Sequence, residues 1–265
     1  SEGWRFTNPF ITDFSRIQEY AAEDGARLPQ RQVSDEGYAH NIAINEESGF
    51  AYLVGSNNCN GGLYLLDLSN PTNPSASGCF TEYGWIFDAQ CVTYDGPDRD
   101  YIDHEICFVS YKDGMGVVDV TNKMVPEALS KVERSYFNSI DQGWLTEDNR
   151  YFLMGDTLYG GYLYTYTVDV SNLDQIAIVK IYSTSINARD GNSFVKGNYV
   201  YQANHRAGLH ILDLSNISNE GLTEAGYFDT TPGMTGSGPD GVYGVYPFFE
   251  SGIVIISSVN EGLYV

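Results

Sequence analysis

The sequence is poor in basic residues. Only 14 Lys and Arg stand against 35 Asp and Glu among 265 residues, which gives a formal net charge of −21. Such a chain repels phosphate backbones and anionic lipid, so we expect neither nucleic acid nor a membrane surface as a partner. We interpret the acidic surface as a source of solubility, with a dedicated cation-binding role as the alternative.

Long apolar runs and a leader segment are also missing. No apolar stretch reaches the ~18 residues that a membrane-spanning helix needs, so we expect no direct membrane insertion. The first residues, Ser1–Arg5, contain no apolar stretch of the kind found in a signal peptide. The chain is therefore expected to be either cytosolic or the mature form of a processed protein.

Motifs of common catalytic sites are absent as well. The sequence has no Gly-x-Ser-x-Gly elbow, no His-Glu-x-x-His and no phosphate-binding glycine loop. The four histidines stand at unrelated positions of the chain: His40, His104, His205 and His210. We therefore favour a protein that is not an enzyme and expect no cofactor, while an enzyme stays open as the alternative.

Four cysteines, all in the first half of the chain, bear on the compartment. None has metal-ligand spacing, and pairing sequence neighbours joins one β-type run to another. Cys91 and Cys107 fit the two strands of a hairpin. We predict the disulfides Cys59–Cys79 and Cys91–Cys107, which point to an extracellular or cell-surface location. Four reduced, buried thiols in a cytosolic protein are the alternative, and a glycosylation sequon at Asn216 adds weak support for secretion.

What the sequence does contain, most clearly, is an internal repeat. A Gly, an alternating apolar run, an Asp and a polar turn recur about every fifty residues. The copies are residues 62–70, 114–122, 164–172 and 208–216, and residues 262–265 begin a fifth.

Each unit holds four β-type runs. In the first unit, Asn41–Asn45 and Phe50–Val54 precede the motif and Ser77–Thr81 follows it. Four short strands repeated in this way are typical of a propeller blade. We predict an all-β fold, a β-propeller of four-stranded antiparallel blades with about five repeat units over residues 37–265. A β-sandwich is the alternative fold. Residues 1–36 lack the repeat and could supply a ring-closing strand or a linker.

The repeated Asp-x-Ser/Thr-Asn turns look like sites because they recur. Asp and Ser side chains accept backbone N–H bonds at strand ends, and Asn tolerates positive φ. A motif present in every blade rarely marks a single site, so we interpret these residues as turn-forming.

Residues that begin the inner strand of each unit are the main candidates for a site at the channel mouth. Aligning the units places six polar residues there: His40, Asn41, Asp88, Asp141, Gln142 and Asn192. Amide and carboxylate oxygens, which Asn41, Asp88, Gln142 and Asn192 offer, suit calcium better than a transition metal. Weak calcium binding at Asp88 and Asp141 is therefore the version of a metal site we predict. The alternative, which we favour, is a water-filled channel. A second acidic group, between Asp95 and Glu105, is expected to be a solvated loop.

Several longer strings carry a family resemblance. Residues 62–67 (GLYLLD) and 208–213 (GLHILD) resemble LVIVD repeats. Other strings resemble the choice-of-anchor B family of secreted or surface-anchored proteins; they are residues 40–45, 88–92, 94–98, 105–108, 142–148, 195–204 and 246–249. The resemblance implies a β-propeller outside the cytoplasm and names no activity. Members carry His at the start of several inner strands; here His40 fits, whereas Phe87, Asp141 and Gly191 do not.

These expectations lead to one favoured function and one alternative. The favoured function is an extracellular, non-enzymatic structural or interaction module on a cell surface or in a larger assembly, with protein or polysaccharide partners. The alternative is a metal-dependent hydrolase that uses the channel mouth, with His40, Asp88 and Asp141 as ligands or acid/base groups.

Overall fold

The computed structural model describes residues 38–137, 139–156, 162–234, 236, 238 and 240–265. The segment expected to close the ring, residues 1–36, lies outside the described residues. Within them, no helix is both long enough and apolar enough to span a bilayer.

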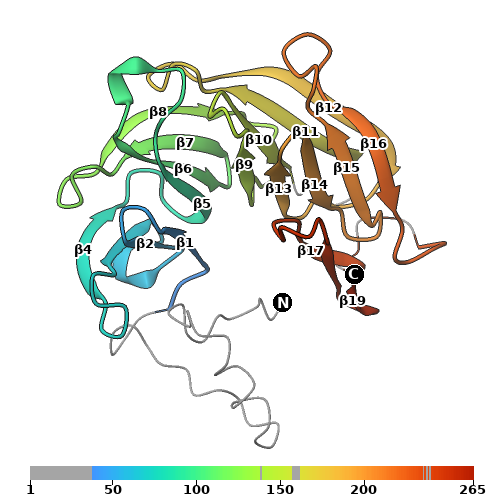
Figure 1. Ribbon diagram of the computed structural model, residues 1–265, viewed down its shortest axis with the longest axis horizontal. Helices are drawn as coiled ribbons and strands as arrows, with labels where there is room; N and C mark the ends of the chain where they lie inside the picture. Colours follow the sequence, from blue (N-terminus) through green and yellow to red (C-terminus); the bar gives the residue numbers. More distant parts are fainter. Residues whose placement is uncertain (1–37, 138, 157–161, 235, 237, 239) are drawn as a thin grey trace, which may run out of the picture.

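Five antiparallel sheets follow one another along the chain, each with its strands paired in sequence order. The first four have four strands and the fifth has three. Figure 1 shows them arranged around a common centre, with the first strand of each sheet innermost and the last outermost. This is the predicted β-propeller, with five blades among the described residues.

The strand bounds of the blades are as follows. Blade 1 contains β1 (Asn41–Asn45), β2 (Phe50–Val54), β3 (Leu63–Asp67) and β4 (Ser75–Phe80). Blade 2 contains β5 (Ile86–Thr93), β6 (Glu105–Tyr111), β7 (Gly114–Asp119) and β8 (Glu127–Glu133). Blade 3 contains β9 (Gly143–Leu145), β10 (Tyr151–Gly155), β11 (Tyr162–Asp169) and β12 (Ala177–Asn187). Blade 4 contains β13 (Ser193–Lys196), β14 (Tyr199–Ala203), β15 (Leu209–Asp213) and β16 (Thr223–Phe228). Blade 5 contains β17 (Val242–Tyr246), β18 (Ile255–Ser258) and β19 (Gly262–Tyr264). Two short 3-10 helices, η1 (Asn57–Cys59) and η2 (Arg99–Tyr101), lie in the β2–β3 and β5–β6 connections.

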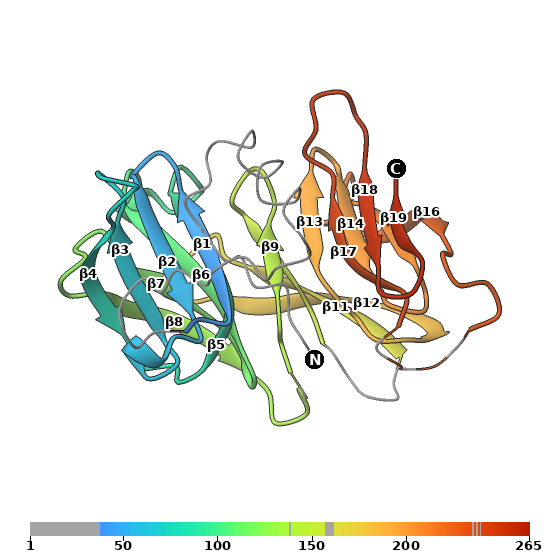
Figure 2. The ribbon, with the colours of Figure 1, turned by 90° about the horizontal axis from the view of Figure 1, so that it is seen from below.

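The second strands of blades 2 and 3 are buried on both faces. Every residue of β6 and of β10 is buried, whereas the outermost strand β16 has one half-buried residue and is otherwise exposed. Blades 2 and 3 each lie between two others, so their second strands face apolar side chains on both sides and have nearly continuously apolar sequences. Figure 2 shows β1, β13 and β17 running across the thickness of the ring.

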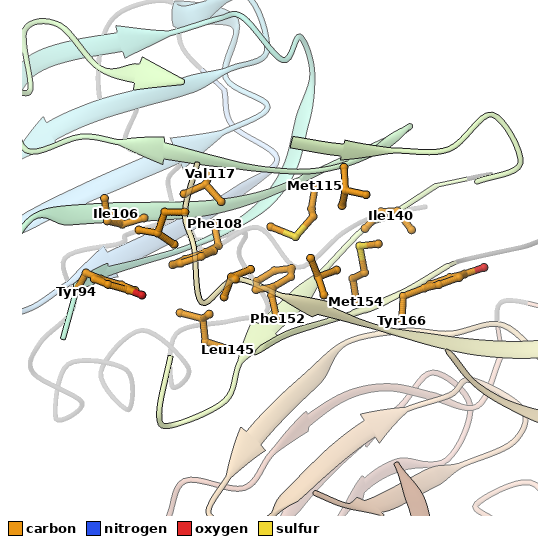
Figure 3. Close-up of a cluster of buried hydrophobic side chains, with 14 of the residues drawn as sticks. Tyr94, Ile106, Phe108, Met115, Val117, Ile140, Leu145, Phe152, Met154 and Tyr166 are labelled. Carbon is orange, nitrogen blue, oxygen red and sulfur yellow. The ribbon is translucent and has the colours of Figure 1, made fainter. Parts of the chain in front are cut away.

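The hydrophobic core is divided among the junctions between blades. One cluster joins blades 1 and 2, with Leu65 and Val109 among its members. A second joins blades 2 and 3, where the rings of Phe108 and Phe152 stack with centroids 5.9 Å apart (Figure 3). Smaller clusters join blades 3 and 4 and blades 4 and 5. The repeat therefore folds as a series in which each blade completes the core of the next.

Both predicted disulfides are present. Cys91 on β5 lies directly opposite Cys107 on β6, with Cα atoms 4.0 Å apart. Cys59, at the end of η1, is bonded to Cys79 on β4. The Cys91–Cys107 disulfide therefore links two strands that are already paired. The Cys59–Cys79 disulfide links the β2–β3 connection to the outer strand of the same blade.

Candidate functional site

Strand pairing decides which residues share a face of the ring. Asn41 at the start of β1 pairs with Val54 at the end of β2, and Ser193 on β13 pairs with Gln202 near the end of β14. The start of each inner strand, the connection after the second strand and the connection from the preceding blade therefore lie at one face. We call it the strand-start face; the opposite face carries the Asp-x-Ser/Thr-Asn turns.

These turns make the hydrogen bonds expected of them. In each, the first Asp accepts a bond from the backbone N–H two residues later, at 2.7 to 2.9 Å; the four acceptors are Asp67, Asp119, Asp169 and Asp213. The bond from the Ser69 N–H lowers the pKa of Asp67, and that from Ser215 lowers the pKa of Asp213. The interpretation of the motif as turn-forming is confirmed.

Two of the predicted channel-mouth residues come together across the first blade junction. The Asn41 side-chain amide donates a 2.7 Å hydrogen bond to Asp88 Oδ1. Burial raises the pKa of Asp88 to about 7, although hydrogen bonds from the Ala89 backbone and from Asn41 act in the opposite direction. Asp88 thus holds a proton for part of the time at neutral pH.

Gln142 bonds across the third junction in the same manner. Its Nε2 donates to the Ser193 carbonyl at 2.8 Å, and its Oε1 accepts the Ser193 backbone N–H at 2.7 Å. At the second junction, Gln90 Oε1 accepts the Leu145 backbone N–H at 2.8 Å. Sequence reasoning did not single out Gln90; its only signal is a long polar side chain on an otherwise largely apolar inner strand. The side chains of Asn41, Gln90 and Gln142 each form a hydrogen bond between successive blades, and we call them the inter-blade clamps.

The other predicted residues have separate surroundings. Asp141 accepts a bond from the Ser139 hydroxyl and lies 3.7 Å from an Arg189 nitrogen. His40 is exposed, and its ring lies edge-on to Phe87 at 5.6 Å. Asn192 is half-buried, and its backbone carbonyl accepts the Ala203 N–H. Among the described residues, no three His, Cys, Asp or Glu side chains are grouped so as to hold a metal ion.

A pair of buried acids at the strand-start face has no sequence signal that we recognised. Asp156 follows β10 and Asp190 precedes β13; they are 4% and 2% exposed. Asp190 Oδ2 accepts the Tyr164 N–H at 3.2 Å, while Oδ1 has no hydrogen-bond partner in the described structure. Burial raises the pKa of Asp190 well above its usual range, and the nearby Asp156 raises it further. Burial therefore favours the protonated form of Asp190.

The acidic loop between β5 and β6 is only partly solvated. Asp95, Asp100 and Asp103 are exposed, as expected for a solvated loop. Glu105 is instead buried, at 6% exposure, which corrects the expectation for this residue. It accepts hydrogen bonds from Asn45, Ser48 and Tyr52 and forms a 2.6 Å ion pair with Lys123, so it belongs to the junction of blades 1 and 2. The reason is that Glu105 begins β6, a strand buried on both faces.

The predicted glycosylation site lies on the surface. Asn216 is exposed in the turn after β15, and its side-chain oxygen accepts a bond from Asn219. Glycosylation of this residue stays a prediction.

An exposed indole, also missed from the sequence, lies at the junction of blades 1 and 2. Trp85 immediately precedes β5 and is 41% exposed. One side of its ring covers the β2–β3 connection, where a β-carbon built on Gly55 or Gly61 would lie 3.0 or 2.8 Å from the indole. The Gly84-Trp85 pair before an inner strand was the only signal for it in the sequence.

Comparison with known families agrees with this architecture. The LVIVD repeat model matches residues 36–82 and 192–230, which contain all the strands of blade 1 and blade 4. The chain is a β-propeller, and two of its blades match the LVIVD repeat model. No curated protein matches this propeller.

Solved structures share its fold at low sequence identity. A protein of Lactobacillus plantarum has a TM-score of 0.59 and 14% identity over 82% of this chain. Hydrazine synthase of Kuenenia stuttgartiensis has a TM-score of 0.56 and 10% identity over 82% of this chain. A periplasmic gluconolactonase of Pseudomonas aeruginosa has a TM-score of 0.60 and 10% identity over 83% of this chain. The match covers 63%, 60% and 63% of those chains, so this propeller spans less than two thirds of each.

Proposed function

We propose that this propeller is an extracellular, non-enzymatic binding module that presents its strand-start face to macromolecular partners. The observation that carries the proposal is the use of polar side chains at the starts of the inner strands. Asn41 and Gln142 are engaged in hydrogen bonds to the next blade, as is Gln90 further along β5. Groups used in this way hold the ring together and are not available to bind a substrate.

The location outside the cytosol rests on the two disulfides. Disulfides form and persist in oxidising compartments and are rare in cytosolic proteins. Both cysteine pairs are bonded here. Together with the strings that resemble the choice-of-anchor B family, this supports assigning the chain to that family of surface-attached propellers. Protein and polysaccharide partners are both compatible with a rigid, acidic surface of this kind.

The proposal is tested on native material and with the purified chain. Non-reducing peptide mapping of protein from its source should recover both disulfides from the extracellular or cell-surface fraction. The fluorescently labelled full chain should bind saturably to matrix isolated from the same source. Four alkylatable thiols in a cytosolic fraction, or no saturable retention on the matrix, would refute the proposal.

One observation favours the hydrolase as a second candidate. The pKa of Asp88, raised to about 7, is suited to a general acid or base at neutral pH. Hydrolysis of gluconolactone, the substrate class named for one structural neighbour, is the direct assay, run with and without added divalent metal. Under the binding-module proposal the rate equals that of the uncatalysed reaction; a faster rate that Asp88→Asn abolishes would establish the hydrolase.

A further inference from the structure

We propose that Trp85 forms the floor of a binding site for a neutral glycan at the junction of blades 1 and 2. The site, which we call the Trp85 platform, comprises the indole, its supporting connection (residues 55–62) and the exposed residues beside it, Tyr38 and His40. This inference rests on the proposed function and names the ligand class of the binding face.

The indole is partly covered and partly exposed. Its covered side rests on Gly55 and Gly61, where any β-carbon would come too close to the ring. Both glycines also have positive φ, 58° and 89°, so side chains are disfavoured there on two grounds. Trp85 nevertheless stays 41% exposed, although a large aromatic ring is usually buried in a monomer. A flat, supported ring that is partly exposed offers a stacking surface to the C–H face of a pyranose.

The supporting connection is rigid. Gly61 O accepts hydrogen bonds from the backbone N–H groups of Gly55, at 3.2 Å, and Ile86, at 2.9 Å. Ser56 caps η1 through its side chain, and Cys59 ties the connection to β4. The ring is therefore held in place before any ligand arrives, which lowers the entropic cost of binding.

Polar residues lie on the connection that supports the indole and beside it. The connection carries three exposed asparagines, Asn57, Asn58 and Asn60. Asn57 also accepts the Tyr38 backbone N–H at 2.8 Å, which holds that tyrosine, 63% exposed, against the same connection. The His40 side chain packs against Gly55 and is exposed. Amide, phenol and imidazole groups both donate and accept hydrogen bonds, as sugar hydroxyls do.

The negative net charge of the molecule favours an uncharged ligand over a polyanionic one. The chain has a net charge of −21, and Glu82 is exposed in the connection that leads to Trp85. Polyanionic chains, such as uronate-rich or sulfated polysaccharides, are repelled by such a surface. Neutral polysaccharides carry no charge to repel and present apolar C–H faces together with hydroxyl groups.

Affinity electrophoresis at neutral pH tests the platform, because the acidic chain migrates readily in native gels. Gels containing a soluble β-glucan, xylan or galactomannan are compared with a plain gel and with one containing alginate. We expect at least one neutral polysaccharide to retard the wild-type chain and alginate to have no effect. Trp85→Ala should weaken that binding about tenfold or more, equivalent to about 1.4 kcal/mol.

Two variants separate stacking from unfolding. Trp85→Tyr keeps an aromatic ring and should bind with an affinity between those of wild type and Trp85→Ala. Tyr227→Ala removes an aromatic side chain that is 68% exposed on β16 and should bind as wild type does. The variants should share the wild-type melting temperature within about 4 °C, a shift that corresponds to about 1–2 kcal/mol in a chain of this size.

The outcomes distinguish this inference from the proposed function. If none of the three neutral polysaccharides retards the wild type, or if Trp85→Ala is retarded equally, the glycan site is refuted. If the wild type is still retained on native matrix in that case, the proposal of a binding module is supported although the glycan site is refuted. Retention that needs Trp85 but survives digestion of the matrix polysaccharide indicates a protein partner and also refutes the glycan site. If the wild type does not bind the matrix at all, both proposals are refuted.

Discussion

At the scale of single residues, the surroundings of a carboxyl group decide what it does. Asp67 lies in an exposed turn and accepts a backbone N–H, which lowers its pKa. Asp88 is buried against the next blade and has a raised pKa, although it also accepts a hydrogen bond. The penalty for burying a charge exceeds the gain from the two donors, the Ala89 backbone and Asn41, so burial shifts Asp88 toward its protonated form.

Asp88 should make the stability of the fold depend on pH. Its folded pKa of about 7 lies above the unfolded value, so its contribution is fully present below about pH 4 and is lost as pH rises through about 7. From about pH 5 to pH 8, the wild type should lose about 2–3 kcal/mol more free energy of unfolding than Asp88→Asn. Urea unfolding at the two pH values measures this difference. Asp100→Asn, at an exposed position, is the control; an identical pH dependence in wild type and Asp88→Asn would contradict the assignment.

At the scale of elements, the two disulfides hold different parts of the chain. Cys91–Cys107 joins two strands that are already paired within the buried core. Cys59–Cys79 restrains the connection between β2 and β3, against which the Trp85 indole packs. Cys91–Cys107 therefore stabilises blade 2. Cys59–Cys79 stabilises blade 1 and also restrains the strand-start face.

Removing each disulfide separately should reveal this division. Replacing either pair by alanines should lower the free energy of unfolding by about 2–5 kcal/mol. The Cys59→Ala/Cys79→Ala variant should in addition bind neutral glycan more weakly, because its supporting connection is loosened, whereas Cys91→Ala/Cys107→Ala should bind as wild type does. Chemical unfolding and affinity gels measure the two effects. Equal glycan binding by both variants would show that the connection needs no covalent restraint.

The inter-blade clamps also belong to this scale. Gln142→Ala leaves the Ser193 backbone N–H and carbonyl without their side-chain partner at a buried position. Leaving a buried group unsatisfied costs about 1–3 kcal/mol, and we expect a loss of that size in urea unfolding. Asn192→Ala, at the corresponding position of the next blade, is the matched control because Asn192 is only half-buried. A loss as large for Asn192→Ala would contradict the specific role of Gln142.

At the scale of the whole molecule, the excess of acidic residues opposes the compact state. Thirty-five acidic and 14 basic residues in one chain give strong self-repulsion, which salt screens. Apolar clusters at each described junction, and buried ion pairs such as Glu105 with Lys123, stabilise the ring against this repulsion.

Raising the ionic strength should therefore raise the melting temperature. Sodium chloride and magnesium chloride at matched ionic strength should give similar increases, followed by circular dichroism. Calcium chloride in the same series tests the calcium site predicted at Asp88 and Asp141. A calcium-specific rise that Asp88→Asn abolishes would establish that site; a fall in melting temperature with any of the salts would contradict the role of self-repulsion.

The sequence by itself determined the features that depend on neighbours along the chain. Repeated apolar alternation specified the strands, as in Asn41–Asn45, because the side chains of a strand alternate between its faces. The Asp67 turn followed because its partner lies two residues away. The pairing of Cys91 with Cys107 followed from the register of one hairpin.

Only the tertiary structure decided the contacts between blades. The partners Asn41 and Asp88, or Gln142 and Ser193, belong to successive blades and are about fifty residues apart, so no local periodicity encodes them. The burial of Asp190 and the exposure of Trp85 depend in the same way on what the neighbouring blade covers. Strand formation is a local property of the chain, whereas the solvation of a side chain at a blade junction depends on how two blades pack.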